Sequence, residues 1–123
     1  MSNILMVFLG GGIGSLTRYG ISAFVKTKLT TMFPLATLFS NILSCVVLAI
    51  AIGFFSAKME MNPTLKLLIL VGFCGGFSTF SSFSFETVEL IRSGNSMYAI
   101  SNILISVVAC TGIIFFLTKS ASA

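Results

Sequence analysis

Four apolar segments occupy nearly the whole chain and leave little room for anything except membrane-spanning helices. They cover about residues 4–25, 34–56, 65–91 and 97–118, and each is close to the ~20 residues with which an α-helix crosses a bilayer. The composition agrees, because 56% of the 123 residues are hydrophobic and only 8% are charged. The sequence therefore predicts an all-α integral membrane protein, a single membrane domain over residues 1–123, with no nucleic-acid partner.

The polar inventory of the chain argues against an enzyme. The sequence contains no histidine, and its acidic residues number three, so a metal-assisted or nucleophilic active site is hard to assemble. Its cysteines, Cys45, Cys74 and Cys110, lie in three different spans without CxxC spacing. We interpret them as small buried hydrophobic residues.

The cations that flank the four spans are evenly divided between the two sides of the membrane. Three fall on each side, Lys26, Lys28 and Arg92 against Lys58, Lys66 and Lys119. The Lys/Arg bias of short loops sets the orientation of a membrane protein, so an even distribution of cations favours neither orientation. We expect the chain to insert both ways up and to form an antiparallel, dual-topology homodimer, which would also supply the second copy that a pore needs.

The third segment is long enough to contain a break. As one helix, residues 65–91 would extend about 40 Å at ~1.5 Å per residue, against a hydrocarbon core of about 30 Å. Helix interruption costs least at Gly75-Gly76, so we expect two half-helices there. The break would free carbonyls between Gly75 and Ser78, and two copies at a dimer axis would close these around one cation. A simple kink satisfied by serine hydroxyls is the alternative.

Aromatic rings alternate with hydroxyls after the glycine pair. Phe80 and Phe83 share a helix face, which Phe77 and Phe73 extend toward the N-terminus. Hydroxyls surround these rings, on Ser78, Thr79, Ser81, Ser82 and Ser84, at a depth where the segment must face protein or water. Ring edges are electropositive, so together with the hydroxyls they make a neutral site for a small hydrated anion. Plain packing is the alternative interpretation of the aromatic stripe.

The second and fourth spans carry matching polar faces. Thr37, Asn41 and Ser44 recur at helical spacing on one face, and the uncharged amide of Asn41 offers two N–H donors. In the fourth span Asn102, Ser106 and Cys110 repeat the pattern and are candidates for the opposite wall of a pore. Helix–helix hydrogen bonding is the alternative for both faces.

Charged residues inside the apolar segments need partners or water. Arg18 lies deep in the first segment and Glu86 one turn after Phe83, and we interpret both as candidates for a wet vestibule, in which Arg18 would raise the local anion concentration. Snorkelling of Arg18 to the surface is the alternative. Glu89 and Arg92 have the spacing of an interfacial ion pair.

The chain resembles the Fluc (CrcB) family of fluoride ion channels over essentially its whole length. The resemblance rests on Gly11-Gly12-Ile13-Gly14 with Arg18-Tyr19, on Thr37-Leu38 with Asn41, and above all on Gly72 to Phe83 followed by Glu86. It implies a passive exporter of toxic fluoride in a bacterial inner membrane, with two pores per antiparallel dimer. The implied pore residues are Phe80, Phe83, Asn41, Thr37, Ser81, Ser82, Thr79 and Ser106. A structural sodium ion at the dimer centre is also implied, held by the Gly75 and Ser78 carbonyls.

Departures from the family pattern are modest. Ala36 and Ser44 stand where glycine is usual, and Ser78 and Ser82 where threonine is common, which preserves the hydroxyls. Cys110 replaces a hydroxyl that would extend the polar face from Ser106, so its role in the pore is open. The rival interpretation is a small multidrug-type, proton-coupled exporter, which needs a carboxylate in the first span, whereas this chain has Arg18 and no acid there.

Overall fold

The structure is a computed structural model, and it describes residues 2–57 and 62–119. It contains four helical spans that are long and apolar enough to cross a membrane, which confirms the predicted all-α membrane class. The first, second and fourth spans are single helices, α1 (Ser2–Lys28), α2 (Leu35–Ala57) and α6 (Ser96–Thr118). The third runs through four elements, α3 (Pro63–Lys66), the π-helix η1 (Leu67–Phe73), α4 (Cys74–Phe77) and α5 (Phe80–Arg92).

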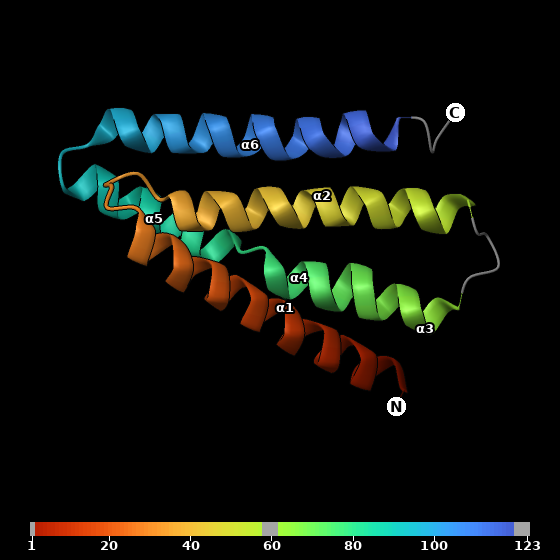
Figure 1. Cartoon of the computed structure of the whole chain (residues 1–123). Helices are drawn as coiled ribbons and strands as arrows, with labels where there is room; N and C mark the ends of the chain where they lie inside the picture. The colour runs from red at the N-terminus through yellow and green to blue at the C-terminus, as the bar shows by residue number, and fades with distance from the viewer. Residues whose placement is uncertain (1, 58–61, 120–123) are drawn as a thin grey trace.

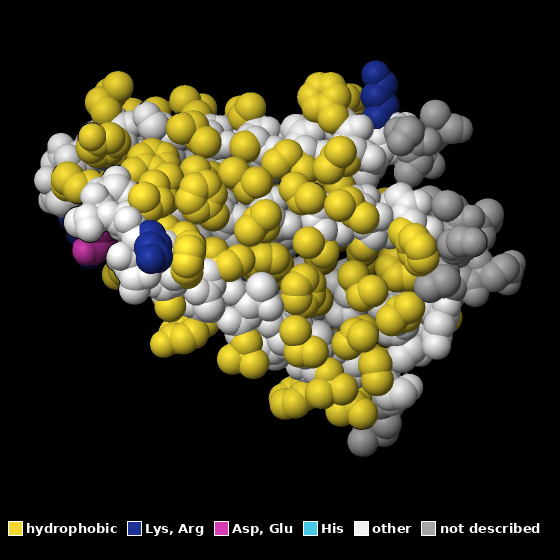
Figure 2. Space-filling model, in the orientation of Figure 1, with side chains coloured by type: hydrophobic (Ala, Val, Ile, Leu, Met, Phe, Trp, Pro, Cys, Tyr) yellow, Lys and Arg dark blue, Asp and Glu magenta, His cyan; other side chains and the backbone are white. Residues whose placement is uncertain are grey.

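The spans run up and down, so the start of α1 and the end of α6 lie at one end of the bundle and the α1–α2 and α5–α6 connections at the other (Figure 1). The third span lies between α1 and α2, and α6 covers the far side of α2 (Figure 1). Hydrophobic side chains dominate the visible surface, with charges near its two ends (Figure 2). Lys58 of the predicted charge balance lies outside the described residues.

Local signals in the sequence explain the ends of the third span. Pro63 occupies the first turn of α3, where a missing N–H costs nothing, and Asn62 caps that turn by accepting the Thr64 N–H at 2.9 Å. At the other end, α5 stops before Gly94, whose φ of 84° suits glycine. The tight turn at Gly94 then returns the chain into α6.

Glycines bring α1 and the first half of the third span into backbone contact. A Cβ atom at Gly72 would lie 2.9 Å from the Gly10 Cα, and one at Gly14 would overlap the Phe73 carbonyl. Close approach through small residues is how helices pack where lipid supplies no hydrophobic driving force. This contact fixes the first half of the third span against α1.

The predicted break exists but lies two residues beyond Gly75-Gly76, at Ser78 and Thr79. Both glycines are helical, and a Cβ at Gly76 would overlap the Gly11 carbonyl, so Gly76 serves close packing. The backbone becomes extended at Ser78 (ψ 160°) and Thr79 (φ −151°, ψ 121°). The break lies at this position because the side chain of Asn41 in α2 bonds to the backbone of Thr79.

Candidate functional site

Asn41 clamps the backbone of the break. Its Nδ2 donates to the Thr79 carbonyl at 3.2 Å, and its Oδ1 accepts the Thr79 N–H at 2.8 Å. Both polar groups of an extended residue inside the bilayer are thereby satisfied, as this depth requires. The Thr79 side chain then starts α5 by accepting the Ser82 N–H at 3.2 Å. The amide that the sequence predicts as an ion donor thus has a structural task, and its contact with an ion stays a prediction.

The same bonds change the partners of two carbonyls. In a continuous helix the Gly75 carbonyl would accept the Thr79 N–H, and the Ser78 carbonyl the Ser82 N–H. Those N–H groups donate instead to Asn41 Oδ1 and Thr79 Oγ1. The carbonyls of Gly75 and Ser78, which are predicted to hold a cation, therefore lack the N–H partners that they would have in a continuous helix.

Arg18 reaches the same turn from α1. Its Nε donates to the Gly76 carbonyl at 3.1 Å, at the C-terminal end of the helical run that begins at Pro63, where a positive charge is favourable. Arg18 also lines a cavity between α1, α2 and α5. The Arg18 side chain therefore both bonds to the backbone of the third span and lines the cavity.

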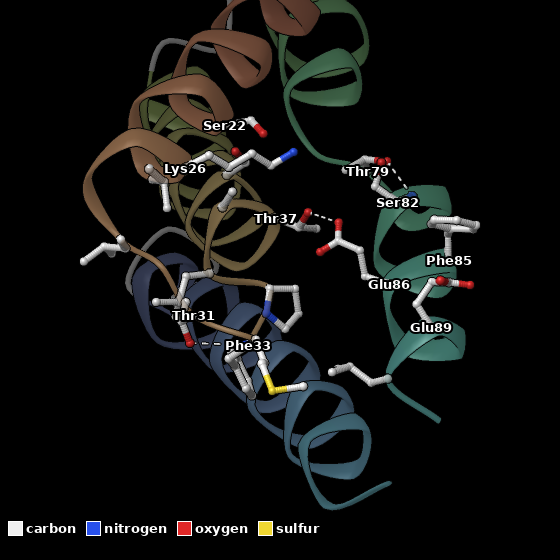
Figure 3. Close-up of a pocket in the computed structure, with 18 of the residues that line it drawn as sticks. Ser22, Lys26, Thr31, Phe33, Thr37, Thr79, Ser82, Phe85, Glu86 and Glu89 are labelled. Carbon is white, nitrogen blue, oxygen red and sulfur yellow. Dashed lines mark hydrogen bonds between the residues drawn. The ribbon is translucent and has the colours of Figure 1, made fainter. Parts of the chain in front are cut away.

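That cavity has a volume of about 900 Å³ and lies near the end of the bundle that carries the α1–α2 and α5–α6 connections (Figures 1 and 3). Figure 3 shows side chains from α1, α2 and α5 facing one another across it. Six of the predicted site and vestibule residues line it, namely Arg18, Thr37, Thr79, Ser81, Ser82 and Glu86.

A hydrogen bond crosses the cavity wall from α2 to α5. The Thr37 hydroxyl donates to Glu86 Oε1, and the Lys26 ammonium attracts the same carboxylate. Both Lys26 and Glu86 appear among the facing side chains in Figure 3. The cavity therefore holds opposite charges rather than a field of one sign.

Phe80 and Phe83 lie apart from this cavity. Their ring centroids are 5.7 Å apart, as expected for one helix face, and Phe80 is 79% exposed. The predicted aromatic stripe does not continue through the break, because Phe77 is buried and pairs with Phe73 at 5.4 Å. The Phe80 ring is thus exposed at the surface of the chain.

The polar residues of α6 bond to α5 and to each other. Asn102 donates to Thr87 Oγ1 at 3.1 Å, and the Ser106 hydroxyl donates to Asn102 Oδ1 at 3.2 Å. Ser44 of α2 likewise donates to the Cys74 carbonyl at 3.0 Å. Ser44 and Asn102 thus make helix–helix bonds, the alternative in the sequence interpretation, whereas the Ser106 hydroxyl bonds within its own helix.

Comparison with known proteins identifies the family. Residues 5–118 match the family model described as CrcB-like protein, Camphor Resistance (CrcB). The chain belongs to the CrcB family. Two curated CrcB relatives named fluoride-specific ion channel FluC are similar over most of their length. That of Serratia proteamaculans is 44% identical over 86% of this chain and 83% of its own, and that of Citrifermentans bemidjiense 40% over 89% of each.

A third CrcB relative extends the match to nearly the whole chain. The fluoride-specific ion channel FluC 1 of Yersinia pestis is 37% identical over 97% of this chain and 95% of its own. These relatives are channels by name, which confirms that the chain belongs to a family of transporters rather than enzymes.

Several residues of this CrcB site escaped the sequence interpretation. Ser22 and Lys26 follow Arg18 at intervals of four and place a polar face of α1 on the cavity. That spacing was available in the sequence and would have found them. Ser40 also lines the cavity region, and its buried hydroxyl has no hydrogen-bond partner among the described residues. Nothing in the pattern around Ser40 predicted this.

Proposed function

We propose that this protein is a fluoride-selective channel that lets toxic fluoride leave the cell passively. The observation that carries the proposal is the match of almost the whole chain to relatives named fluoride-specific ion channels. The relatives come from bacteria, and we assign the chain to the inner membrane of a bacterial cell as a multi-pass protein. A proton-coupled multidrug exporter is not favoured, because α1 carries no carboxylate.

Neutral donors suit this task. Conduction needs binding that replaces hydration yet still releases the ion, and the second half of the third span offers hydroxyls on Thr79, Ser81 and Ser82 beside the cavity. The positive charges of Arg18 and Lys26 attract anions to that cavity, while the Glu86 carboxylate accepts a hydrogen bond from the Thr37 hydroxyl. The ring edges of Phe80 and Phe83 and the amide of Asn41 continue the path in this proposal.

An antiparallel homodimer completes the path. The outward Phe80 ring is 79% exposed on one protomer, and a second copy would cover it and provide the other wall. Two copies related in this way give two pores. The even distribution of cations supports insertion in both orientations, and reporters fused to the C-terminus should be found on both sides of the membrane; one side only would contradict the dual topology.

The dimer centre is suited to a structural sodium ion. Gly75 is exposed on the protomer, with nothing within 4 Å of the place a side chain would occupy. Its carbonyl and that of Ser78 have lost their helical N–H partners, and carbonyl oxygens are ligands for hard cations. Four carbonyls from two copies would surround the cation, which would tie the protomers together. Exchange of sodium for N-methylglucamine should then shorten the lifetime of the purified dimer.

Ion-selective electrodes test the central proposal. Purified protein in liposomes loaded with fluoride and chloride should release fluoride and retain chloride. Phe80→Ile and Phe83→Ile should each abolish the efflux while the dimer persists, because ring edges are lost at similar volume. Phe116→Ile, at an exposed ring on α6, is the matched control and should conduct normally. Chloride release by the unaltered protein would overturn the proposed selectivity, and normal fluoride flux in both pore variants would overturn the role of the ring edges.

A further inference from the structure

Side chains from two different helices bond to the backbone on either side of the break in the third span. Arg18 of α1 donates from Nε to the Gly76 carbonyl at 3.1 Å, close to the point where the first half stops being helical. Asn41 of α2 bonds to the N–H and the carbonyl of Thr79, where the second half begins. Because the third span lies between α1 and α2 (Figure 1), the break is held from both neighbours.

The Ser78 carbonyl is fixed by contacts within the protomer. The Ser78 N–H donates to the Cys74 carbonyl at 3.1 Å, and the Ser78 hydroxyl donates to the same oxygen at 3.0 Å. The Ser78 carbonyl itself shares a planar peptide group with the Thr79 N–H. Since that N–H is bonded to Asn41 Oδ1, the same bond restricts the direction of the Ser78 carbonyl.

The Gly75 carbonyl lies at the freed end of a helical run. In a continuous helix the Gly76 carbonyl, one residue further on, would accept the Phe80 N–H, and it accepts the Arg18 Nε–H instead. Adjacent glycines are a permissive pair of backbone residues, so a helix end at Gly75-Gly76 unwinds easily unless another group holds it. The bond from Arg18 supplies that hold, and a positive charge at a helix C-terminus is favourable.

We propose that Arg18 is a positioning residue for the cation site: its bond to Gly76 holds the end of the first half, and with it the orientation of the Gly75 carbonyl. This inference rests on the proposed sodium ion at the dimer centre, whose carbonyl ligands have lost their helical N–H partners. The charge of Arg18 acts against the role, since a guanidinium repels a nearby cation. The hydrogen bond and the charge therefore have opposite effects on sodium binding, which makes them separable.

Two substitutions separate the hydrogen bond from the charge. Glutamine carries its Nε2 donor as many bonds from the backbone as arginine carries Nε, so Arg18→Gln removes the charge and keeps a donor at that place. Arg18→Met has a methyl group there and removes both. Lys28→Met is the matched control, because Lys28 is a cation of the same helix whose ammonium lies over the Phe24 ring, 6.0 Å from its centroid.

The experiment measures subunit exchange between two pools of full-length protein in detergent, labelled with different fluorophores at the N-terminus, by energy transfer. Sodium replaces N-methylglucamine stepwise at constant ionic strength, and the sodium midpoint is the concentration at which exchange is slowed half-way. Arg18→Met should raise this midpoint about tenfold, as expected for the loss of one hydrogen bond to a charged group. Arg18→Gln should not raise it, and Lys28→Met should leave it unchanged.

An unchanged sodium midpoint in Arg18→Met would overturn the inference, even if its exchange were faster at every sodium concentration, because Arg18 would then have only a structural role. A lower midpoint in both Arg18 variants would overturn it too, since charge repulsion would outweigh positioning. A midpoint raised by Arg18→Gln would show that the charge is what counts, and this test remains valid if Arg18→Met forms no dimer.

Fluoride efflux from liposomes separates this inference from the proposed function. Exchange of the unaltered protein that does not respond to sodium would reject both the sodium site and the positioning role of Arg18. A protein that releases fluoride and whose sodium midpoint is the same with and without the Arg18 donor would reject the positioning role alone. A protein that never releases fluoride, but whose midpoint rises in Arg18→Met, would reject the channel and leave Arg18 as a positioning residue of a cation site.

Discussion

The two halves of the third span are held by opposite means. The first half, α3 to α4, lies against α1 with backbone on backbone, and Gly10, Gly14, Gly72 and Gly76 leave no room for a side chain at the contact. The second half, α5, is joined to its neighbours by side-chain hydrogen bonds, from Thr37 to Glu86 and from Asn102 to Thr87.

A polar segment can be kept at membrane depth when a closely packed segment supports it. Lipid gives no hydrophobic driving force for helix association, so the first half uses close packing to become a fixed support. The second half then departs from it at Ser78 and Thr79, and several of its hydroxyls stay available to the cavity. The break between them depends on one amide side chain, that of Asn41.

The largest effect is expected from Gly76→Val, which tests the packed half. Even a Cβ atom there would overlap the Gly11 carbonyl, and overpacking of this kind costs about 3 kcal/mol of unfolding free energy. Thermal unfolding in detergent, followed by circular dichroism, should show a lower midpoint. Gly12→Val is the matched control, since Gly12 has nothing within 4 Å of its missing side chain. Equal midpoints for the two variants would contradict the backbone contact.

Asn41→Ala should have the next largest effect and tests the junction. It leaves the N–H and carbonyl of Thr79 without the partners they have now, at a cost of about 2 kcal/mol. Ser44→Ala is the control on the same helix, because the Cys74 carbonyl that it frees still accepts from the Ser78 N–H at 3.1 Å. If both variants unfold alike, the amide clamp is not what holds the break.

The sequence was sufficient to predict the class of the fold because apolar segments of bilayer length have few alternatives. It also predicted an interrupted third span, but it placed the break at Gly75-Gly76. Glycine is permissive in two senses, since it allows both a break and a close approach, and the sequence alone does not say which use applies. The structure shows that Gly76 is used for approach.

The sequence predicted which polar residues share a helix face, but not which residues they contact on other helices. Helical spacing correctly placed Thr37, Asn41 and Ser44 on one face, and all three donate to the third span. Periodicity within one helix carries no information about which helix lies opposite. The bonds from Thr37 to Glu86 and from Asn41 to Thr79 join residues far apart in the sequence, so they required the structure.

Asn102→Ala tests whether the polar side chains that join α6 to α5 act as a network. Asn102 is 1% exposed, donates to Thr87 and accepts from Ser106, so its loss should cost about 1.5 kcal/mol. Ser106→Ala should cost less, about 1 kcal/mol. The double variant should cost less than the sum of the two, because both changes remove the same bond. Strict additivity in thermal unfolding would mean that these side chains act separately.

The smallest effect is expected from Glu89→Gln, at the end of α5 where the polar half meets water. Glu89 pairs with Arg92 at 3.7 Å, but both side chains are more than half exposed, and solvent screens such pairs to less than about 0.5 kcal/mol. Glu86→Gln, which alters the partner of Thr37 inside the cavity, is the comparison. Unfolding at low and high salt should show little change for Glu89→Gln and a larger, salt-insensitive loss for Glu86→Gln. The reverse order would place the stabilising interaction of α5 at its exposed end rather than along the face that meets α2.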